Sequence, residues 1–238
     1  MKEYKFSDSL NQRIVDGILK GYKSYLKERK EKNEIMHVST AYAWVKGNHI
    51  DHNTAESCRS EGVIFKEEKA GYTWGYLQFI DKKSIFIIKS GNRNSKYISS
   101  LDQENYLVKL SKINSHIKFP GENEQSSLFQ EDLTIFDENA GLSLTNEEVE
   151  LLQSQYDRFY IVSYSLDDAK MIKGITLGMP IPETDRSFLI DDLTQYINKS
   201  TVKIESDELM SIGNDVPEEL SGNNFGIKLI SEKGTGNN

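Results

Sequence analysis

The sequence predicts an α/β or α+β fold in which helices flank a mixed sheet that contains a three-stranded meander. Two observations support this prediction. Apolar residues recur at helical spacing between residues 10 and 26, and three strand-like segments follow one another between residues 63 and 89. Further helix and strand patterns lie in an acidic C-terminal portion.

The first helix is expected to begin at Leu10, after a capping residue at Asp8 or Ser9, and to run to about Lys32. Its apolar positions form two adjacent rows, and within each row successive residues are about one turn apart. One row is Leu10, Ile14, Ile18 and Tyr22, and the other is Val15, Leu19, Tyr22 and Leu26. Gly17 and Gly21 also lie one turn apart, so another backbone could approach this helix closely there.

The middle of the chain is expected to begin with a short helix around 41–45, a loop at "KGNHIDHN" and a helix from about Thr54. Three strands should follow at 63–66, 72–80 and 84–89, joined by connections of hairpin length. The unbroken "IFII" of the third strand predicts burial on both faces of the sheet.

Further elements are expected beyond the meander. A helix should span about 102–116, and Thr145 with Glu148 forms a capping box that opens a helix to about Tyr156. "RFYIVSYSLDD" and "MIKGITLGMPIP" read as paired strands, 187–197 as a short amphipathic helix and "FGIKLI" as a late strand.

Charge divides the chain into portions. Residues 1–118, a basic helical and three-stranded portion, have 21 Lys/Arg and 14 Asp/Glu, a net charge of +7, while residues 119–238 have 8 and 23, a net charge of −15. We expect an acidic loop or linker at 119–144. An acidic portion at 145–220 either completes the sheet or forms a small lobe, and a tail at 221–238 has a disordered end. The basic portion favours contact with nucleic acid, unless the two portions pack together and neutralise each other.

Composition argues against several classes of protein. No apolar run approaches the roughly 20 residues that span a bilayer, and no apolar stretch follows the N-terminal lysines, so neither a membrane partner nor a secretory signal is expected. The single cysteine, Cys58, excludes an internal disulfide and a cysteine-based zinc site. These observations favour a cytoplasmic protein.

The order of helix, three-stranded meander, helix and strand resembles the core of the PD-(D/E)xK nuclease superfamily. The resemblance implies a catalytic site of Asp81 on the second strand and Lys89 on the third, with Glu56 from the preceding helix. Carboxylates of such a site hold Mg²⁺, and the lysine orients or activates the attacking water.

One position departs from that pattern. Ile87 stands two residues before Lys89, where the family has an acid, and isoleucine offers no oxygen to a hard cation. Glu67 and Glu68 of the neighbouring hairpin are the candidate substitutes for this acid. The alternative is a plain buried hairpin whose terminal lysine emerges into water.

A second candidate is a metal site at "HIDH". His49, Asp51 and His52 lie within four residues, and imidazole and carboxylate ligands suit zinc or a first-row metal. A solvated turn, in which Asp51 caps the following helix, is the competing interpretation.

Nucleic-acid binding is suggested by basic residues interleaved with tyrosines on the first helix and by basic residues in a later polar loop. The candidate residues are Lys20, Lys23, Lys27, Arg29, Lys30, Arg93 and Lys96. A solvated basic face, with the tyrosines in the core, is the alternative.

Four segments, "AYAWVKGNHIDHNTAE", "AGYTWGYLQFID", "ENYLVKLSKIN" and "RFYIVSYSLDD", resemble in this order an uncharacterised family of Gram-positive bacteria and their phages. The resemblance implies an intracellular, phage or mobile-element setting. We therefore expect a non-catalytic binding protein of phage–host conflict that contacts nucleic acid or a host protein. The alternative is a metal-dependent nuclease that uses Mg²⁺, or an inactive form of one.

Overall fold

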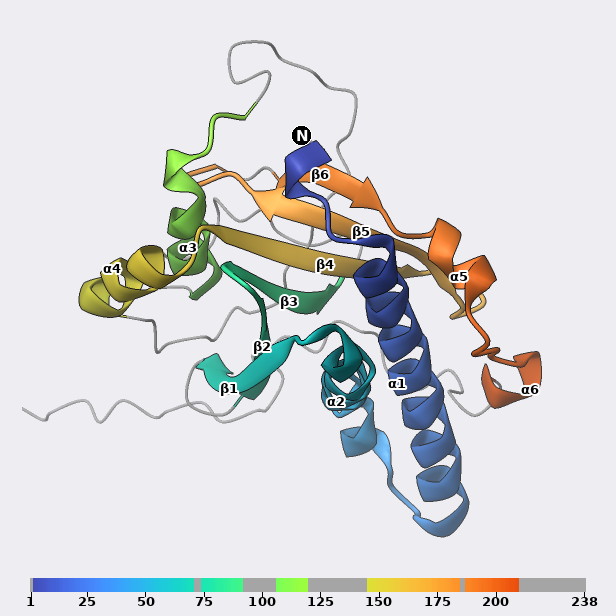
Figure 1. Ribbon diagram of the computed structural model, residues 1–238. Coiled ribbons are helices and arrows are strands. Elements are labelled where there is room, and N and C mark those ends of the chain that lie inside the picture. Colours follow the sequence, from blue (N-terminus) through green and yellow to red (C-terminus); the bar gives the residue numbers. More distant parts are fainter. Residues whose placement is uncertain (1, 71–73, 92–105, 120–144, 185–186, 210–238) are drawn as a thin grey trace, which may run out of the picture.

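A computed structural model describes residues 2–70, 74–91, 106–119, 145–184 and 187–209. In these ranges helices cover both faces of one six-stranded sheet, with the strand order β1-β2-β3-β4-β5-β6 (Figure 1). The mixed helix and strand fold predicted from the sequence is therefore confirmed. The expected strand "FGIKLI", the tail at 221–238 and, apart from Phe119, the acidic segment at 119–144 lie outside the described residues.

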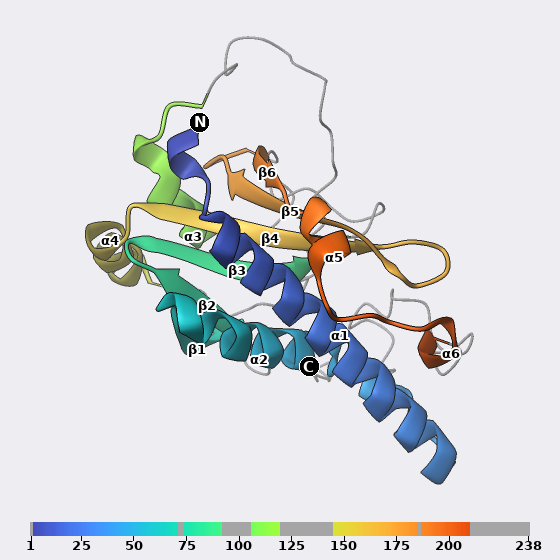
Figure 2. The same cartoon turned by 45° about the vertical axis from the view of Figure 1, so that its right-hand side comes forward.

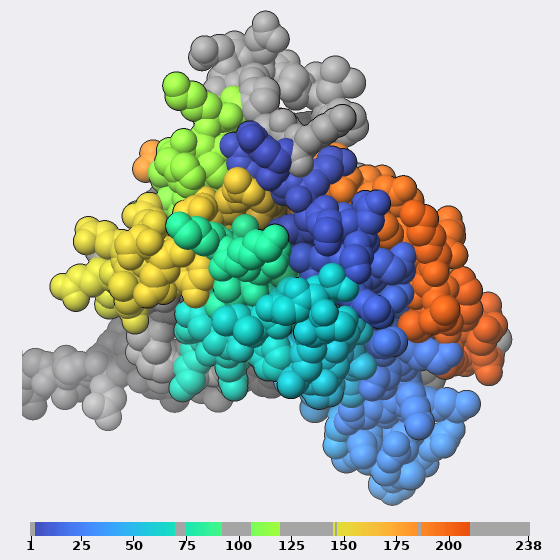
Figure 3. Space-filling model, in the orientation of Figure 1, coloured from blue at the N-terminus to red at the C-terminus, as the bar shows by residue number. Residues whose placement is uncertain are grey.

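The long helix α1 (Asp8–Ile35) begins two residues earlier than predicted, because the Ser7 side chain caps it by accepting a hydrogen bond from the Leu10 amide. The predicted apolar stripe is buried against the sheet, with Ile14, Val15 and Ile18 wholly inaccessible to solvent. The C-terminal half of α1 extends beyond the sheet (Figure 3).

After a 3₁₀ turn, η2 (Thr40–Ala43), helix α2 (Lys46–Cys58) packs along α1, and a second 3₁₀ turn, η3 (Arg59–Glu61), follows. The predicted loop at "KGNHIDHN" was wrong, because these residues form the first two turns of α2. A Cβ placed on Gly17 would lie 2.4 Å from the Thr54 Cα, and one on Gly21 would lie 2.4 Å from the Ile50 Cα. This close approach buries one side of α2 and stabilises a helix that its own glycine and asparagines disfavour.

The sheet is mixed. β1 (Ile64–Ala70), β2 (Trp74–Asp81) and β3 (Ser84–Ser90) form the predicted antiparallel meander. β4 (Arg158–Leu166) pairs parallel to β3, and β5 (Ile172–Pro180) and β6 (Ser187–Asp192) continue the sheet antiparallel. The strands of the acidic portion thus complete the sheet that the basic portion begins.

The two faces of the sheet bury two separate apolar clusters. Phe79, Phe86 and Ile88 pack with α1 and α2, which lie across the front of the sheet in Figure 2. Ile85 and Ile87 point to the other face, which is covered by α3 (Tyr106–Ser111), η5 (Lys112–His116) and α4 (Asn146–Gln155). The predicted burial of "IFII" on both faces is confirmed, as is the capping box of Thr145 and Glu148 at the start of α4.

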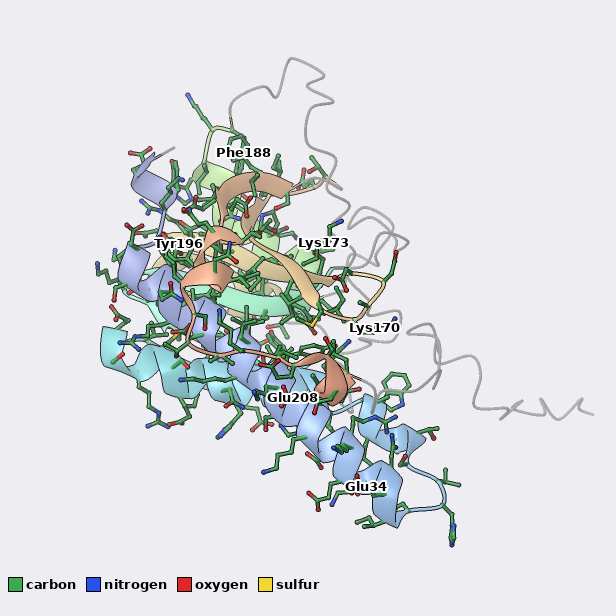
Figure 4. All side chains as sticks on the ribbon, turned by 90° about the vertical axis from the view of Figure 1, so that its right-hand side faces the viewer. Glu34, Lys170, Lys173, Phe188, Tyr196 and Glu208 are labelled. Atoms are coloured by element: carbon green, nitrogen blue, oxygen red, sulfur yellow. The ribbon has the colours of Figure 1, made fainter. Side chains whose placement is uncertain are left out.

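The helix predicted at 187–197 was wrong in its first half. These residues form the edge strand β6, and the short helix α5 (Gln195–Lys199) follows it. From α5 to α6 (Ser206–Leu209) the chain runs along α1 (Figure 4). The Tyr196 hydroxyl donates to Asp8 near the start of α1, and Glu208 forms an ion pair with Lys23 farther along it.

Among the described residues, three ion pairs join the oppositely charged portions of the chain. Lys5 pairs with Asp191 at 2.5 Å, Lys23 with Glu208 at 3.3 Å and Lys83 with Asp157 at 3.8 Å. Such exposed pairs contribute little free energy each, but they offset part of the charge division seen in the sequence. In the described ranges no helix is long and apolar enough to cross a membrane.

Substituting alanine for Gly17 or Gly21 should lower the free energy of unfolding by roughly 2 kcal/mol or more, because the new Cβ meets backbone atoms of α2 that cannot rotate away. Gly47→Ala is the matched control within α2, since nothing lies within 4 Å of its added Cβ. It should be neutral or stabilise by about 0.5–1 kcal/mol. Urea denaturation measures both, and equal effects at all three sites would contradict the proposed close contact.

Candidate functional site

Strands β2 and β3 pair only near their turn, at Phe79 with Phe86, Ile80 with Ile85 and Asp81 with Ser84. Beyond these pairs β2 remains bonded to β1, and β3 remains bonded to β4. We call the ends that do not pair with each other, residues 74–78 of β2 and 87–90 of β3, the fork. An opening between neighbouring strands exposes backbone groups that need other partners.

Asp51, on α2, supplies one of these partners. Its Oδ2 accepts a hydrogen bond from the Leu77 amide at 3.0 Å, on the edge of β2 that faces β3. Burial raises the pKa of the Asp51 carboxyl from 3.8 to about 6, while the bond from Leu77 and the charge of Lys89 act in the opposite direction. Asp51 is therefore a partly buried acid on which the charge of the Lys89 ammonium acts.

Lys89 leaves β3 on the face covered by α3. Its Nζ lies 5.8 Å from the ring centroid of Tyr76 and 5.0 Å from that of Tyr106, whose two rings are 4.7 Å apart. The face of an aromatic ring attracts a cation electrostatically. The rings hold the lysine at the fork instead of letting it extend freely into water.

Gln78 lies in the same fork and is completely buried. Its Nε2 donates to the Tyr76 hydroxyl at 2.9 Å, but its Oε1 has no hydrogen-bond partner among the described residues. A buried oxygen without a donor costs free energy, and such atoms are uncommon in folded proteins. The fork therefore contains the amide oxygen of Gln78, without a partner among the described residues, and a lysine beside two rings, and the partly buried carboxylate of Asp51 reaches it from α2.

The predicted catalytic residues are not brought together. Extending the hairpin register sets Lys89 level with Tyr76, five residues or roughly 16 Å along β2 from Asp81. Asp81 lies at the turn, at the opposite end of the hairpin from the fork. Glu56 lies on the exposed side of α2, where it forms an ion pair with Arg59 at 2.9 Å.

The proposed substitutes for the missing acid also have other surroundings. Glu68 forms an ion pair with Lys66 at 2.9 Å, and Glu67 lies on the exposed outer strand beside Gly75. Ile87 is completely buried in the apolar cluster beneath α3 and α4. Among the described residues, a carboxyl on which the charge of Lys89 acts is that of Asp51, from the group that the sequence suggested as a metal site.

The three residues of that group diverge. His49 bonds Glu28 and Ser24 of α1, Asp51 bonds Leu77, and His52 is exposed. Residues two apart on a helix point in nearly opposite directions, so His49 and Asp51 cannot share a ligand. Among the described residues no group of three or more His, Cys, Asp or Glu side chains could hold a metal ion.

The predicted nucleic-acid-binding residues have different environments. Arg29 is buried and donates to the Ser39 carbonyl at 2.5 Å, because it continues the inward row of Tyr22, Tyr25 and Leu26. Lys23 bonds Glu208 and the Lys203 carbonyl. Lys20, Lys27 and Lys30 are exposed on α1, whereas Arg93 and Lys96 lie outside the described residues.

Gln78 and the role of Asp51 were not identified from the sequence. A signal for Gln78 was present, because a glutamine within the apolar strand "WGYLQFI" must either leave the core or find a polar partner. Nothing local indicated that Asp51 would reach β2. Cys58 is completely buried, and burial raises the pKa of its thiol to about 12, which leaves it unreactive.

Asp51→Asn should stabilise the protein at neutral pH. The folded-state pKa of Asp51 is raised, so the wild type loses stability as the pH rises from about 4 to 6, and the loss persists above that range. Two pKa units correspond to about 3 kcal/mol, which the variant recovers at pH 7.5 but not near pH 4. Urea denaturation at both values, with the exposed Asp168→Asn as control, measures this. A gain independent of pH would contradict it.

No family model, curated protein or solved structure matches this chain. The chemistry of the fork is therefore the starting point for its function. Its three polar side chains come from three different elements, α2, β2 and β3. Each is partly or wholly buried. Polar and ionisable groups that are buried in this way are often found at functional sites.

Proposed function

We propose that the fork of this protein binds the phosphate backbone of a nucleic acid. The observation that carries the proposal is the placement of Lys89 beside the paired rings of Tyr76 and Tyr106, where its charge also acts on the Asp51 carboxyl. A lysine held in this way presents its ammonium as a fixed point charge, which suits a phosphate oxygen.

We propose that a divalent cation takes part in this binding. Mg²⁺ keeps several waters and is usually bound by one or two carboxylates together with substrate phosphates. Asp51 would provide the carboxylate. A bound cation would neutralise phosphate charge beside Lys89.

Metal-dependent hydrolysis of the phosphodiester is the second candidate function. It is favoured by the Asp51–Lys89 interaction, which joins a carboxylate and a lysine as the PD-(D/E)xK resemblance requires, although with Asp51 in place of Asp81. Lys89 would then orient the attacking water. The buried Ile87, which replaces the second acid, is the reason that binding is preferred over catalysis.

The biological setting that we propose is phage–host conflict, as the family resemblance implies. A protein of this kind can act without catalysis by occupying a nucleic acid of its host or of an invader. A host protein partner is the competing interpretation, and absence of nucleic-acid binding would favour it.

Binding is tested by fluorescence anisotropy with single- and double-stranded DNA and RNA at 50–300 mM salt, with Mg²⁺ or with EDTA. Lys89→Ala should weaken binding about tenfold and reduce the slope of log K against log salt by about one. Lys83→Ala is the matched control, because Lys83 is an exposed lysine at the turn of the same hairpin. Binding that is absent, insensitive to salt or equally affected by both variants would overturn the proposal.

Hydrolysis is tested on the same substrates with Mg²⁺ or Mn²⁺. If the second candidate holds, cleavage should be lost in Lys89→Ala and Asp51→Asn and should persist in Asp81→Asn, because Asp81 lies far from the fork. Cleavage that depends on Asp81 and not on Asp51 would contradict the assignment of the carboxylate. Binding without any cleavage would leave the binding function alone.

A further inference from the structure

A row of three hydrogen-bonded side chains joins α1 and α2 away from the fork. The Ser24 hydroxyl oxygen lies 3.1 Å from His49 Nδ1, and His49 Nε2 lies 2.6 Å from Glu28 Oε2. Ser24 and Glu28 are one turn apart on α1, and His49 reaches between them from α2. The ring of His49 also contacts the Tyr25 ring, at 6.4 Å between centroids, which restricts its rotation.

The partners decide which ring nitrogen carries the proton in the neutral imidazole. A carboxylate oxygen accepts hydrogen bonds and does not donate them, so Nε2 must hold the proton that is shared with Glu28. Nδ1 is then a free lone pair, and the Ser24 hydroxyl donates to it. This is the arrangement of an activated nucleophile, in which a base contacts the hydroxyl and a third group orients the base.

We propose that Ser24 is a nucleophile that accepts an acyl group from a carboxylic ester with a good leaving group. Ser24 Oγ forms a bond to the carbonyl carbon while its proton passes to His49 Nδ1. The tetrahedral intermediate then expels the alcohol oxygen, which takes that proton, and the acyl group remains on Ser24. Attack by water along the same path would release the acid and restore the serine.

The surroundings of Ser24 indicate the charge of the ester. The hydroxyl is only partly buried, so a small molecule can reach it. Lys20 and Lys27 lie four residues before and three residues after Ser24, on the side of the helix away from Glu28, and both are exposed. Their charges favour an anionic ester and the negative oxygen of the intermediate.

The first experiment treats the full-length protein with a fluorophosphonate and measures intact mass. One adduct per chain is expected, and Ser24→Ala should abolish it. Ser154→Ala is the matched control, because Ser154 is an exposed helical serine whose hydroxyl donates to the Leu151 carbonyl and to no histidine. Absence of an adduct, or an adduct that survives in Ser24→Ala, would overturn the proposal.

A second experiment follows release of p-nitrophenol from p-nitrophenyl acetate and from the anionic mono-p-nitrophenyl ester of glutaric acid. His49→Gln should slow acylation about 100-fold, the usual range for loss of a general base. Glu28→Gln retains an acceptor for Nε2 and should retain more activity than Glu28→Ala, while thermal melting confirms that each variant folds. Lys20→Gln with Lys27→Gln should slow only the anionic ester. Equal rates in wild type and Ser24→Ala would again contradict the proposal.

Discussion

The close contact between α1 and α2 at Gly17 and Gly21 is the constraint on which both candidate sites depend. Side chains larger than hydrogen at these positions would meet the Cα atoms of Thr54 and Ile50, so the two helices approach backbone to backbone. Helix α2 carries His49 and Asp51, which point in nearly opposite directions. The placement of α2 against α1 therefore determines where two side chains lie: His49, the base beside Ser24, and Asp51, the carboxylate at the fork.

The fork gathers features that lower stability. A carboxylate is partly buried there, an amide oxygen lacks a donor among the described residues, and a lysine is held against two rings. An apolar trio at these positions would fold more stably, because none of these groups would lose hydration. Such groups are gathered at one end of an otherwise apolar strand pair. This is typical of a functional site, where residues that lower stability are kept for their role in binding.

Local patterns predicted the parts of the fold that local interactions determine. The buried "IFII" strand, the Thr145 capping box and the apolar rows of α1 all follow from spacing alone. The first turns of α2 were missed because the contact with α1 stabilises them. Arg29 was misassigned although its spacing from Tyr22, Tyr25 and Leu26 already placed it on the inward face. The position of Arg29 around the helix therefore predicted its burial better than its charge did.

The candidate site illustrates a second limit of sequence reasoning. Asp81 and Lys89 are close in the chain, but a hairpin places residues opposite each other according to their distance from the turn. Asp81 lies at the turn and Lys89 near the far end, so the residues that can cooperate with Lys89 are those level with Tyr76. The carboxylate that reaches this level, Asp51, comes from a different element 38 positions earlier. The tertiary structure thus places Asp51 at the fork and not Asp81. Any chemistry at the fork therefore depends on α2 as much as on the hairpin.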